Sequence, residues 1–452
     1  MAIPFRRYAI ILLLLGVAMC PLFSQEASAS PAFGMNLGIG VQSFDEAGGS
    51  VTYQSLSLAP DVAFGKFGIG LAITINYRFT GDGNSFEIRQ GDWIPTSFQN
   101  FLGIYLPKIT YLRWGQKGEP LFIKLGSIDD ATLGNGFIVG NYSNTLRLPS
   151  DRHFGLNLDL DGALFNFPFL GIETFIGNLA VLDVFGGRIY ARPLVSTEIP
   201  ILRNLEVGAS LALDRRPDLY AASLNPVSTV SAFGLDMSLP IWYVENIFSL
   251  VTFADIASTP RKISDRAWGG MLGFGGRLVK FITYGAQLRV LGADFIPVYF
   301  DPTYDAVRQL KYDLVRTGDF SKTAVGWFAS LGTSLLEDKI VFNMSLDGPF
   351  GKPEPAAADP AKDALNYPHL RGIFVIGEGL VPGLSFDFSY DKKGIKEWKS
   401  LISAENAAIQ ARLNYMTGPG IISFVYKIRY MPEKVADPWV VTSGLETSLK
   451  LF

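Results

Sequence analysis

Few side chains in this chain could act as nucleophiles or general bases. The 452 residues include only two histidines, His153 and His369. Ser150, Asp151 and His153 lie close together and supply the side-chain types of a hydrolytic triad. Such a triad works only when the fold aligns the serine, the histidine and the acid, and closeness in sequence does not provide that alignment. We therefore predict no catalytic residues, and hydrolysis is the alternative that these positions leave open.

Metal and nucleotide sites have little support. The single cysteine, Cys20, lies in an apolar N-terminal segment, and two histidines without a cysteine are a poor ligand set for a transition metal. The Gly68-Ile69-Gly70 cluster lacks the strand–loop–helix setting of a phosphate-binding loop. We therefore expect no metal and no cofactor.

The N-terminal segment has the pattern of a secretory signal. Arg6 and Arg7 precede an apolar run over residues 8–22, which is short for a membrane-spanning helix. We predict a signal peptide over residues 1–25 and a single domain over residues 26–452.

Acylation of Cys20 is the alternative for this segment, but Met19 is a poor residue before an acylated cysteine. The formal net charge is -3, and it becomes -5 if the two arginines leave with residues 1–25, which contain no acid. This modest balance argues against a nucleic-acid partner.

The remaining reactive side chains are charged residues set at every second position of apolar segments. Between residues 67 and 79 every odd position is apolar or aromatic, and the even positions include Asn76 and Arg78. Between residues 154 and 161 the even positions are Phe or Leu, and the odd positions end in Asp159 and Asp161. A repeat of two is the period of a β-strand with two different faces.

The composition fits such strands in a membrane. The chain is 48% hydrophobic and contains 47 Gly, yet no apolar run of about 20 residues follows the leader. A strand with one face toward lipid and one toward water is hydrophobic without any long run. We predict an all-β fold, a transmembrane antiparallel up-and-down β-barrel of about 18–20 strands, with 16 also acceptable. A soluble β-sandwich is the alternative.

The connections between the predicted strands alternate in length, as expected when short turns lie on the periplasmic side and long loops outside. The region 171–196 shows no clear pattern. The predicted short connections are 60–66, 116–119, 167–170, 279–280, 337–338, 381–383 and 418–420. The predicted long ones are 80–100, 129–150, 214–229, 257–266, 293–321, 348–369, 391–404 and 431–438.

The C-terminal strand carries a resemblance to a known class. Leu445, Leu449 and Leu451 alternate on one face, and the chain stops on Phe452. This pattern resembles the C-terminal assembly signal of Gram-negative-type outer-membrane β-barrels, although Thr447 stands at a position that is usually apolar. The whole chain resembles porins of that class in architecture.

The resemblance implies a place in the outer membrane of a diderm bacterium. It also implies outer-membrane lipid, the barrel-assembly machinery and periplasmic chaperones as partners, and it leaves a homo-oligomer open. The implied function is passive diffusion of small hydrophilic solutes through a water-filled lumen. The candidate pore-lining residues are Arg78, Lys124, Asp159, Asp161, Glu206, Asp236, Arg289, Asp387, Arg412, Lys427 and Arg429.

The order of these charges suggests a field across the lumen. Acids predominate between residues 154 and 240, and bases between residues 412 and 429, so the two groups would lie on opposite walls. Local pairing of both signs around a wet wall is the alternative.

One long loop is a candidate for narrowing the lumen, and a second is predicted to contain a helix. Residues 129–150 are Gly-rich and apolar at 133–137, and they resemble the third outer loop of general porins, which sets pore size. Asp129, Asp130 and Arg147 would then line the constriction. The alternative is a surface loop packed on its neighbours. Residues 304–315 have apolar side chains at helical spacing, which predicts a lid helix or a surface epitope. The alternatives to a porin are a transporter for fatty acids or other hydrophobic compounds, and an adhesin or surface antigen on a plugged barrel.

Overall fold

The computed structural model of the chain describes residues 32–46, 49–80, 85–145, 152–219, 228–262, 264–336, 339–351, 366–418, 420–430 and 439–450. The fold reported below refers to these residues. The predicted signal peptide lies outside them, as do Leu451 and Phe452.

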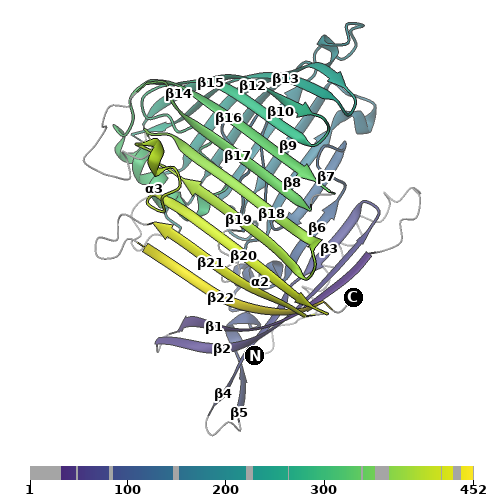
Figure 1. The fold of residues 1–452 in the computed structure, drawn as a ribbon, viewed down its shortest axis with the longest axis vertical. Helices are drawn as coiled ribbons and strands as arrows, with labels where there is room; N and C mark the ends of the chain where they lie inside the picture. Colours follow the sequence, from purple (N-terminus) through teal and green to yellow (C-terminus); the bar gives the residue numbers. More distant parts are fainter. Residues whose placement is uncertain are drawn as a thin grey trace.

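Antiparallel strands make up nearly all of the regular structure (Figure 1). The first eleven are β1 (Ala32–Glu46), β2 (Gly49–Phe64), β3 (Phe67–Leu71), β4 (Ile73–Thr80), β5 (Ser85–Ile88), β6 (Ile109–Trp114), β7 (Leu121–Gly126), β8 (Gly155–Asp161), β9 (Leu170–Ile176), β10 (Val184–Ala191) and β11 (Glu206–Asp214). The others are β12 (Val230–Val244), β13 (Phe248–Arg261), β14 (Asp265–Leu278), β15 (Ile282–Leu291), β16 (Ala324–Leu335), β17 (Ile340–Pro349), β18 (His369–Val381), β19 (Leu384–Lys392), β20 (Ala407–Thr417), β21 (Gly420–Tyr430) and β22 (Trp439–Lys450).

The strand pairings form a ring. From β6 onward each strand pairs with the next, and β22 pairs with β1 from Asn36 with Lys450 to Ile39 with Thr447. The series of pairings therefore returns to its first strand. This arrangement confirms the predicted all-β, antiparallel, up-and-down fold.

The number of separate strands is larger than predicted. The sheet has 22 strands, but β3 and β4 follow one line, interrupted at Ala72, and both pair with β2. β6 and β5 lie on the other side of that line. β3 and β4 therefore share one position in the ring, and β5 and β6 share the next. The 22 strands thus occupy 20 positions. The extra strands arise from the break at Ala72 and from β5, which lies within the predicted loop 80–100.

Strand β12 shows how the alternating sequence is placed. Phe233, Leu235 and Met237 are 39%, 61% and 42% exposed, whereas Ala232 and Asp236, on the opposite face of the strand, are buried. A half-buried sheet of a soluble protein has the opposite polarity, with apolar residues inside and charged residues outside.

The strand registers join such exposed residues into a belt. Leu235 lies opposite Ile256 on β13, and Phe424 on β21 lies opposite both Leu413 and Leu445. Other exposed apolar residues of this outer face are Ile189, Leu211, Leu272, Phe274, Leu288, Val290, Val325, Leu331 and Met344.

Most of the connections that the structure describes have the predicted lengths, and one does not. The predicted loop 431–438 lies outside the described residues. The predicted long loop 257–266 is wrong, because β13 continues to Arg261 and β14 begins at Asp265, leaving only residues 262–264 between them. The two strands continue through most of the residues of this predicted loop. The region 171–196, which had no clear pattern, contains β9 and β10.

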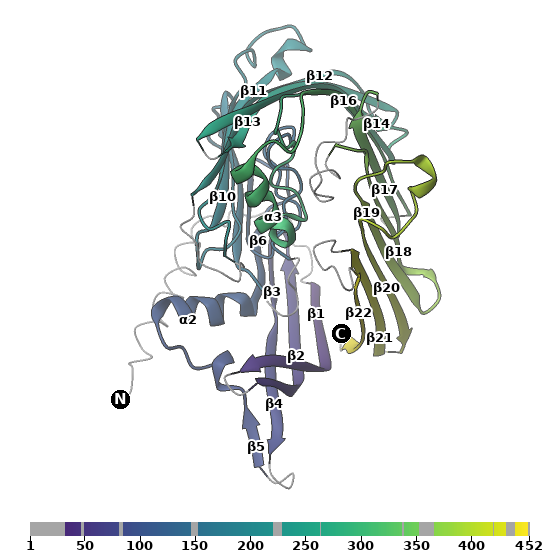
Figure 2. The same cartoon turned by 90° about the vertical axis from the view of Figure 1, so that its left-hand side faces the viewer.

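The wall of the ring is uneven. β6 to β10 contain six to eight residues each, whereas β12, β13 and β14 contain 14 or 15. Helix α2 (Phe98–Tyr105) lies outside the wall near β3 and β6, and helix α3 (Tyr304–Thr317) lies inside it (Figure 2). Within the described residues, no helix is long and apolar enough to cross a membrane.

The buried core lies within the ring. Two connections supply most of it, residues 127–145 between β7 and β8 and residues 292–323 between β15 and β16. Their apolar side chains pack against small inward residues of the wall, including Ala212 on β11, Ala232 on β12 and Ala257 on β13. The interior of this ring is therefore partly filled by its own loops.

Candidate pore interior

The first inner loop, residues 127–145, is fixed at its base. Ala131 and Tyr142 exchange backbone hydrogen bonds of 3.0 and 2.8 Å. The side chain of Asn144 accepts from the N–H of Ile128 at 2.8 Å and donates to the carbonyl of Gly177 at 2.8 Å. The side chains of Ile128, Tyr142 and Asn144 are almost completely buried. This base holds the loop against the ends of β7, β8 and β9.

The tip of the loop lies on a strip of charged residues along the wall. The N–H of Gly134 donates to Glu173 Oε2 on β9 at 2.9 Å. The side chain of Asn135 donates to Asp255 Oδ1 on β13 at 2.6 Å. Gly134 and Gly136 have φ angles of 54° and 83°, in the left-handed region where glycine is favoured. The Gly-rich sequence of the tip thus permits a tight turn on the wall.

Arg188 on β10 is the centre of this strip. Its guanidinium donates to Asp236 Oδ2 at 2.9 Å, to Glu206 Oε1 at 2.9 Å and to Glu173 Oε1 at 3.0 Å. The side chain of Arg188 is 2% exposed. Three carboxylates from β9, β11 and β12 therefore surround one buried guanidinium, and the five N–H donors of arginine suit such a cluster.

A second arginine, Arg192, extends the network to the end of β10 that leads into residues 192–205. Arg192 bonds Glu206 Oε2 at 3.2 Å and also pairs with Asp161 on β8. Tyr190 donates to Asp161 Oδ2 at 3.2 Å, and its ring lies about 5 Å from both guanidinium carbons. The charged strip thus runs continuously from β8 to β13.

The second inner loop, residues 292–323, contains α3 and confirms the predicted helix at 304–315. Arg308 on α3 donates to Asp214 Oδ2 at the end of β11 at 2.5 Å and to Asp183 Oδ2 at 2.7 Å. Tyr304 donates to the same Asp214 oxygen at 2.6 Å. Tyr304, Arg308 and Asp214 are at most 2% exposed. The helix is clamped to the wall and is not a free surface epitope.

The two inner loops also contact each other. Val139 and Phe300 form a parallel bridge, in which the N–H of Phe300 donates to the carbonyl of Ile138 at 3.1 Å. Both Val139 and Phe300 are fully buried. The loops therefore form one inner body rather than two independent segments.

The ends of the second loop are held by charged groups. Asp294 accepts from the backbone N–H groups of Asp319, Phe320 and Ser321 at 2.8 to 3.0 Å and from Arg261 at 2.8 Å. Burial alone would raise the pKa of the Asp294 carboxyl, but these donors outweigh it and hold the pKa below its usual range.

The face of α3 toward β19 carries a second ion pair. Lys311 Nζ lies 2.7 Å from Asp301 Oδ2 and donates to the carbonyl of Tyr299 at 2.7 Å. Burial lowers the pKa of Lys311. Burial would raise the pKa of Asp301, but Lys311 and Lys393, which follows β19, hold it below its usual value. The loop thus extends from the β10–β11 wall toward the β19 side.

The predicted pore-lining residues of the acid-rich wall come together in the structure. Asp161, Glu206 and Asp236 all belong to the arginine network. Asp159 lies opposite Glu173 in the register of β8 and β9. Lys124 Nζ lies 2.9 Å from Asp129 Oδ2.

The other predicted residues are spread over separate strands. Arg289 bonds Asp347 Oδ2 at 3.2 Å, and Asp387 lies opposite Arg412 in the register of β19 and β20. Arg78 pairs at 2.8 Å with Glu87 in the β4–β5 hairpin. Lys427 and Arg429 lie on β21, and Leu449 lies on β22 opposite Gly420 and Leu37.

The loop residues proposed for the constriction have different positions. Asp129 and Asp130 are exposed at the base of the first inner loop, and the backbone carbonyl of Asp130 accepts from Lys117 at 2.8 Å. Arg147 lies outside the described residues. Instead, Gly134 and Asn135 make the polar contacts of the tip.

The idea of two walls of opposite charge is wrong in its simple form. Arg188 and Arg192 stand among the acids of β8 to β12 and pair with four of them. Asp387 likewise lies among the bases of β20 and β21. Arg188 and Arg192 are not among the predicted pore-lining residues, although their alternation with the outward-facing Ile189 indicates that they face inward.

Each of the two histidines lies beside an aspartate, and the structure does not describe the predicted partners of His153. His153 Nδ1 lies 3.7 Å from Asp305 on α3, and Ser150 and Asp151 lie outside the described residues. His369 Nε2 lies 3.1 Å from Asp391 Oδ1 in the register region of β18 and β19. In the described part of the chain, no three His, Cys, Asp or Glu side chains are grouped to hold a metal ion.

Comparison with known proteins gives matches only among solved structures. No protein-family model and no curated protein sequence matches the chain. OpdL of Pseudomonas aeruginosa is 11% identical over 94% of this chain and 99% of its own, with a TM-score of 0.32. OccAB4 of Acinetobacter baumannii is 11% identical over 94% and 98%, with a TM-score of 0.31.

The ferric enterobactin receptor PfeA of P. aeruginosa is 10% identical over 94% of this chain and 75% of its own, with a TM-score of 0.36. Because these TM-scores and identities are low, the description of the fold rests on the strand pairings and not on these similarities.

Proposed function

We propose that the chain is a porin-like channel of the outer membrane of a diderm bacterium, through which small hydrophilic solutes diffuse passively. The observation that carries this proposal is the polarity of the ring. Apolar residues such as Leu235 form an exposed outer belt, and charged residues such as Arg188 and Asp236 lie inside. A lipid-facing exterior with a polar interior is the arrangement of an outer-membrane barrel.

Solutes would pass between the inner body and the opposite wall. The two inner loops are anchored on β9 to β13, and the inward faces of β19 to β21 carry Asp387, Arg412 and Lys427. Both signs of charge along this route would favour hydrated polar solutes with weak ion selectivity. The first inner loop is then the constriction, as its sequence suggests, with its tip at Gly134 and Asn135.

The test is single-channel conductance of the refolded mature protein in a planar bilayer with KCl. We expect steps of a stable size. Excision of residues 133–140 joins Thr132 to Asn141, whose backbone N–H already donates to Thr132 Oγ1 at 2.9 Å, and keeps the Ala131–Tyr142 ladder. We expect larger steps from this variant because it removes the tip and leaves the anchored base.

A second candidate function has specific support. The inner loops share a large apolar core, and Arg308 clamps α3 to the wall, as expected if the ring is plugged. A plugged ring suits a transporter for hydrophobic compounds or a surface-binding protein. Silence of both the intact protein and the excised variant, with correct folding shown by circular dichroism, would favour this candidate over the channel.

The remaining partners follow from the same proposal. The C-terminal residues Leu449, Leu451 and Phe452 would be read by the barrel-assembly machinery after delivery by periplasmic chaperones. Deletion of Phe452 should lower the yield of assembled protein in the outer membrane, measured by fractionation.

A further inference from the structure

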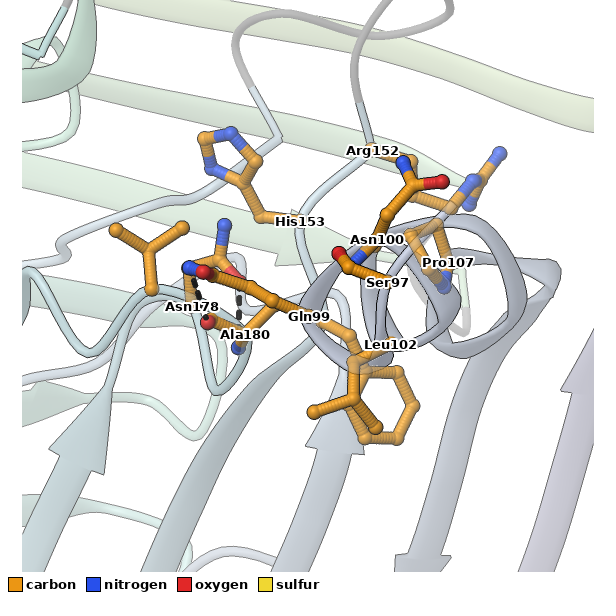
Figure 3. A pocket seen from close by; sticks show the side chains of 12 residues that line it. Ser97, Gln99, Asn100, Leu102, Pro107, Arg152, His153, Asn178 and Ala180 are labelled. Atoms are coloured by element: carbon orange, nitrogen blue, oxygen red, sulfur yellow. Dashed lines mark hydrogen bonds between the residues drawn. The ribbon is translucent and has the colours of Figure 1, made fainter. Parts of the chain in front are cut away.

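A cavity of about 370 Å³ lies between α2 and two segments at the ends of β8 and β9 (Figure 3). Helix α2 supplies Asn100 and Leu102, the segment before β8 supplies Arg152, and the connection between β9 and β10 supplies Asn178. In Figure 3, Asn100 lies beside Arg152, and Asn178 lies across from them. The cavity therefore joins three segments that are far apart in sequence.

The cavity lies where the wall is low. β7 ends at Gly126, opposite Gly155 at the start of β8, and β9 ends at Ile176, opposite the next residue, Leu156. The β4–β5 hairpin extends beyond this level, because Gly126 lies in register with Tyr111 and Gly70 and the chain continues from there to Thr80. Helix α2 stands on the outer side of this notch (Figure 2).

Among the described residues that line the cavity, the charge is unbalanced. Arg152 makes no ion pair or hydrogen bond with the residues that the structure describes, and none of the twelve lining residues is acidic. Burial lowers the pKa of Arg152. A half-buried guanidinium of this kind is completed by an anion.

Two amides add donors toward the same space. The side-chain oxygen of Asn100 accepts from the N–H of Thr96 at 3.0 Å, and that of Asn178 accepts from the N–H of Ala180 at 3.0 Å. These bonds fix the orientation of both amides and leave their NH₂ groups to donate elsewhere. Arg152 and two amide donors form a suitable set for a carboxylate or phosphate.

Apolar surface continues from the cavity along the outer side. Leu102, Phe154 and Val181 line it, and Phe98 on α2 and the preceding Ile94 are 55% and 60% exposed. An acyl chain could lie on these side chains while its head group is held by Arg152. We propose that the cavity binds the carboxylate or phosphate head of a single-chain amphiphile. The placement of the acyl tail rests on the proposed membrane setting. The proposed binding does not depend on an open pore.

Binding is measured by isothermal titration calorimetry of the protein in phosphatidylcholine nanodiscs, with empty nanodiscs subtracted. The probes are decyl phosphate, decanoate, decanol and inorganic phosphate. We expect saturable binding of the two anionic amphiphiles, weaker by about tenfold or more in Arg152→Gln, because a hydrogen-bonded ion pair contributes on this scale. Arg152→Lys should retain part of the affinity.

The matched control is Arg277→Gln, which makes the same change at an exposed position beside the β14–β15 turn, away from this cavity. Asn178→Leu is a second test variant, which also serves if Arg152→Gln fails to fold. It should likewise weaken anion binding. Equal binding of inorganic phosphate and decyl phosphate would assign the site to free anions. Equal binding of decanol, or unchanged anion binding in both site variants, would overturn the proposal. Channel conductance is recorded separately, so its absence would not be mistaken for a failure of this site.

Discussion

The guanidinium of Arg188 on β10 reaches the carboxylate of Asp236 on β12 by passing over β11. The register places Gly208 of β11 directly opposite Asp236. A Cβ atom at Gly208 would lie 2.5 Å from Arg188 Nε. The missing side chain at Gly208 therefore leaves the space that this buried ion pair occupies.

Gly208→Ala should disrupt the arginine network. Arg188 is held by three carboxylates and cannot move without breaking bonds, so we expect a loss of about 1–3 kcal/mol in stability, as for other overpacked sites. Unfolding in urea, followed by tryptophan fluorescence, measures the change. Gly187→Ala is the control, because its nearest neighbouring atom is 3.6 Å away. Equal stability of the two variants would contradict this account.

Substitution of two exposed leucines can test whether the outer belt faces lipid or water. Leu235 on the outer belt is 61% exposed, and Leu310 on α3 is 44% exposed. If the belt meets lipid, Leu235→Arg should destabilise the protein by about 2–4 kcal/mol, whereas Leu310→Arg should have little effect. Unfolding in lipid vesicles measures both. A neutral Leu235→Arg would argue that this face meets water.

The clamp on α3 predicts a change in channel behaviour. Arg308→Gln leaves Asp183 and Asp214 without their partner, which costs about 3–5 kcal/mol at buried pairs. We expect α3 to loosen and the single-channel current to become noisier or larger. Arg316→Gln is the control, because its side chain is 52% exposed. Identical traces from both variants would show that α3 does not border the ion path.

Asp294 predicts a dependence of stability on pH. Its folded pKa is lower than that of an unfolded aspartate, about 3.9, so its contribution is fully present above about pH 4. The contribution is lost as the pH falls through the lower folded pKa. Asp294→Asn should therefore lower the melting temperature near pH 7, and the difference from the unchanged protein should shrink below about pH 4. A difference that is constant over this range would exclude the carboxylate as its source.

The alternation of the sequence was enough to assign faces. It placed Asp236 and Arg412 inward and Leu413 outward, because side chains of a strand alternate strictly between two sides. The contact of Arg188 with Asp236 could not be found this way. It depends on the register of three strands, and the register is fixed by the 14-residue connection between β10 and β11, whose path no local pattern determines.

For the inner loops too, the sequence predicts the local structure but not the contacts between distant residues. The glycines and apolar residues of 133–137 indicated a packed loop, and the spacing of 304–315 indicated a helix. Neither feature identified the partners, because Arg308 meets Asp183 and Asp214 only after the ring has brought β10 and β11 beneath α3. Whether the first loop limits the passage of solutes stays a prediction.

The join between β1 and β22 also has a consequence for biogenesis. Thr447 Oγ1 lies 3.5 Å from the carbonyl oxygen of Ile39, across 408 residues of sequence. Contacts this remote form late, because closing a long loop costs entropy that local contacts do not pay. Until the last strand arrives, β1 has an unpaired edge open to a wrong partner. The pairing of β1 with β22 therefore completes the ring. A chain that ends before β22 leaves the edge of β1 unpaired, and the two inner loops must already lie inside the ring when these strands pair.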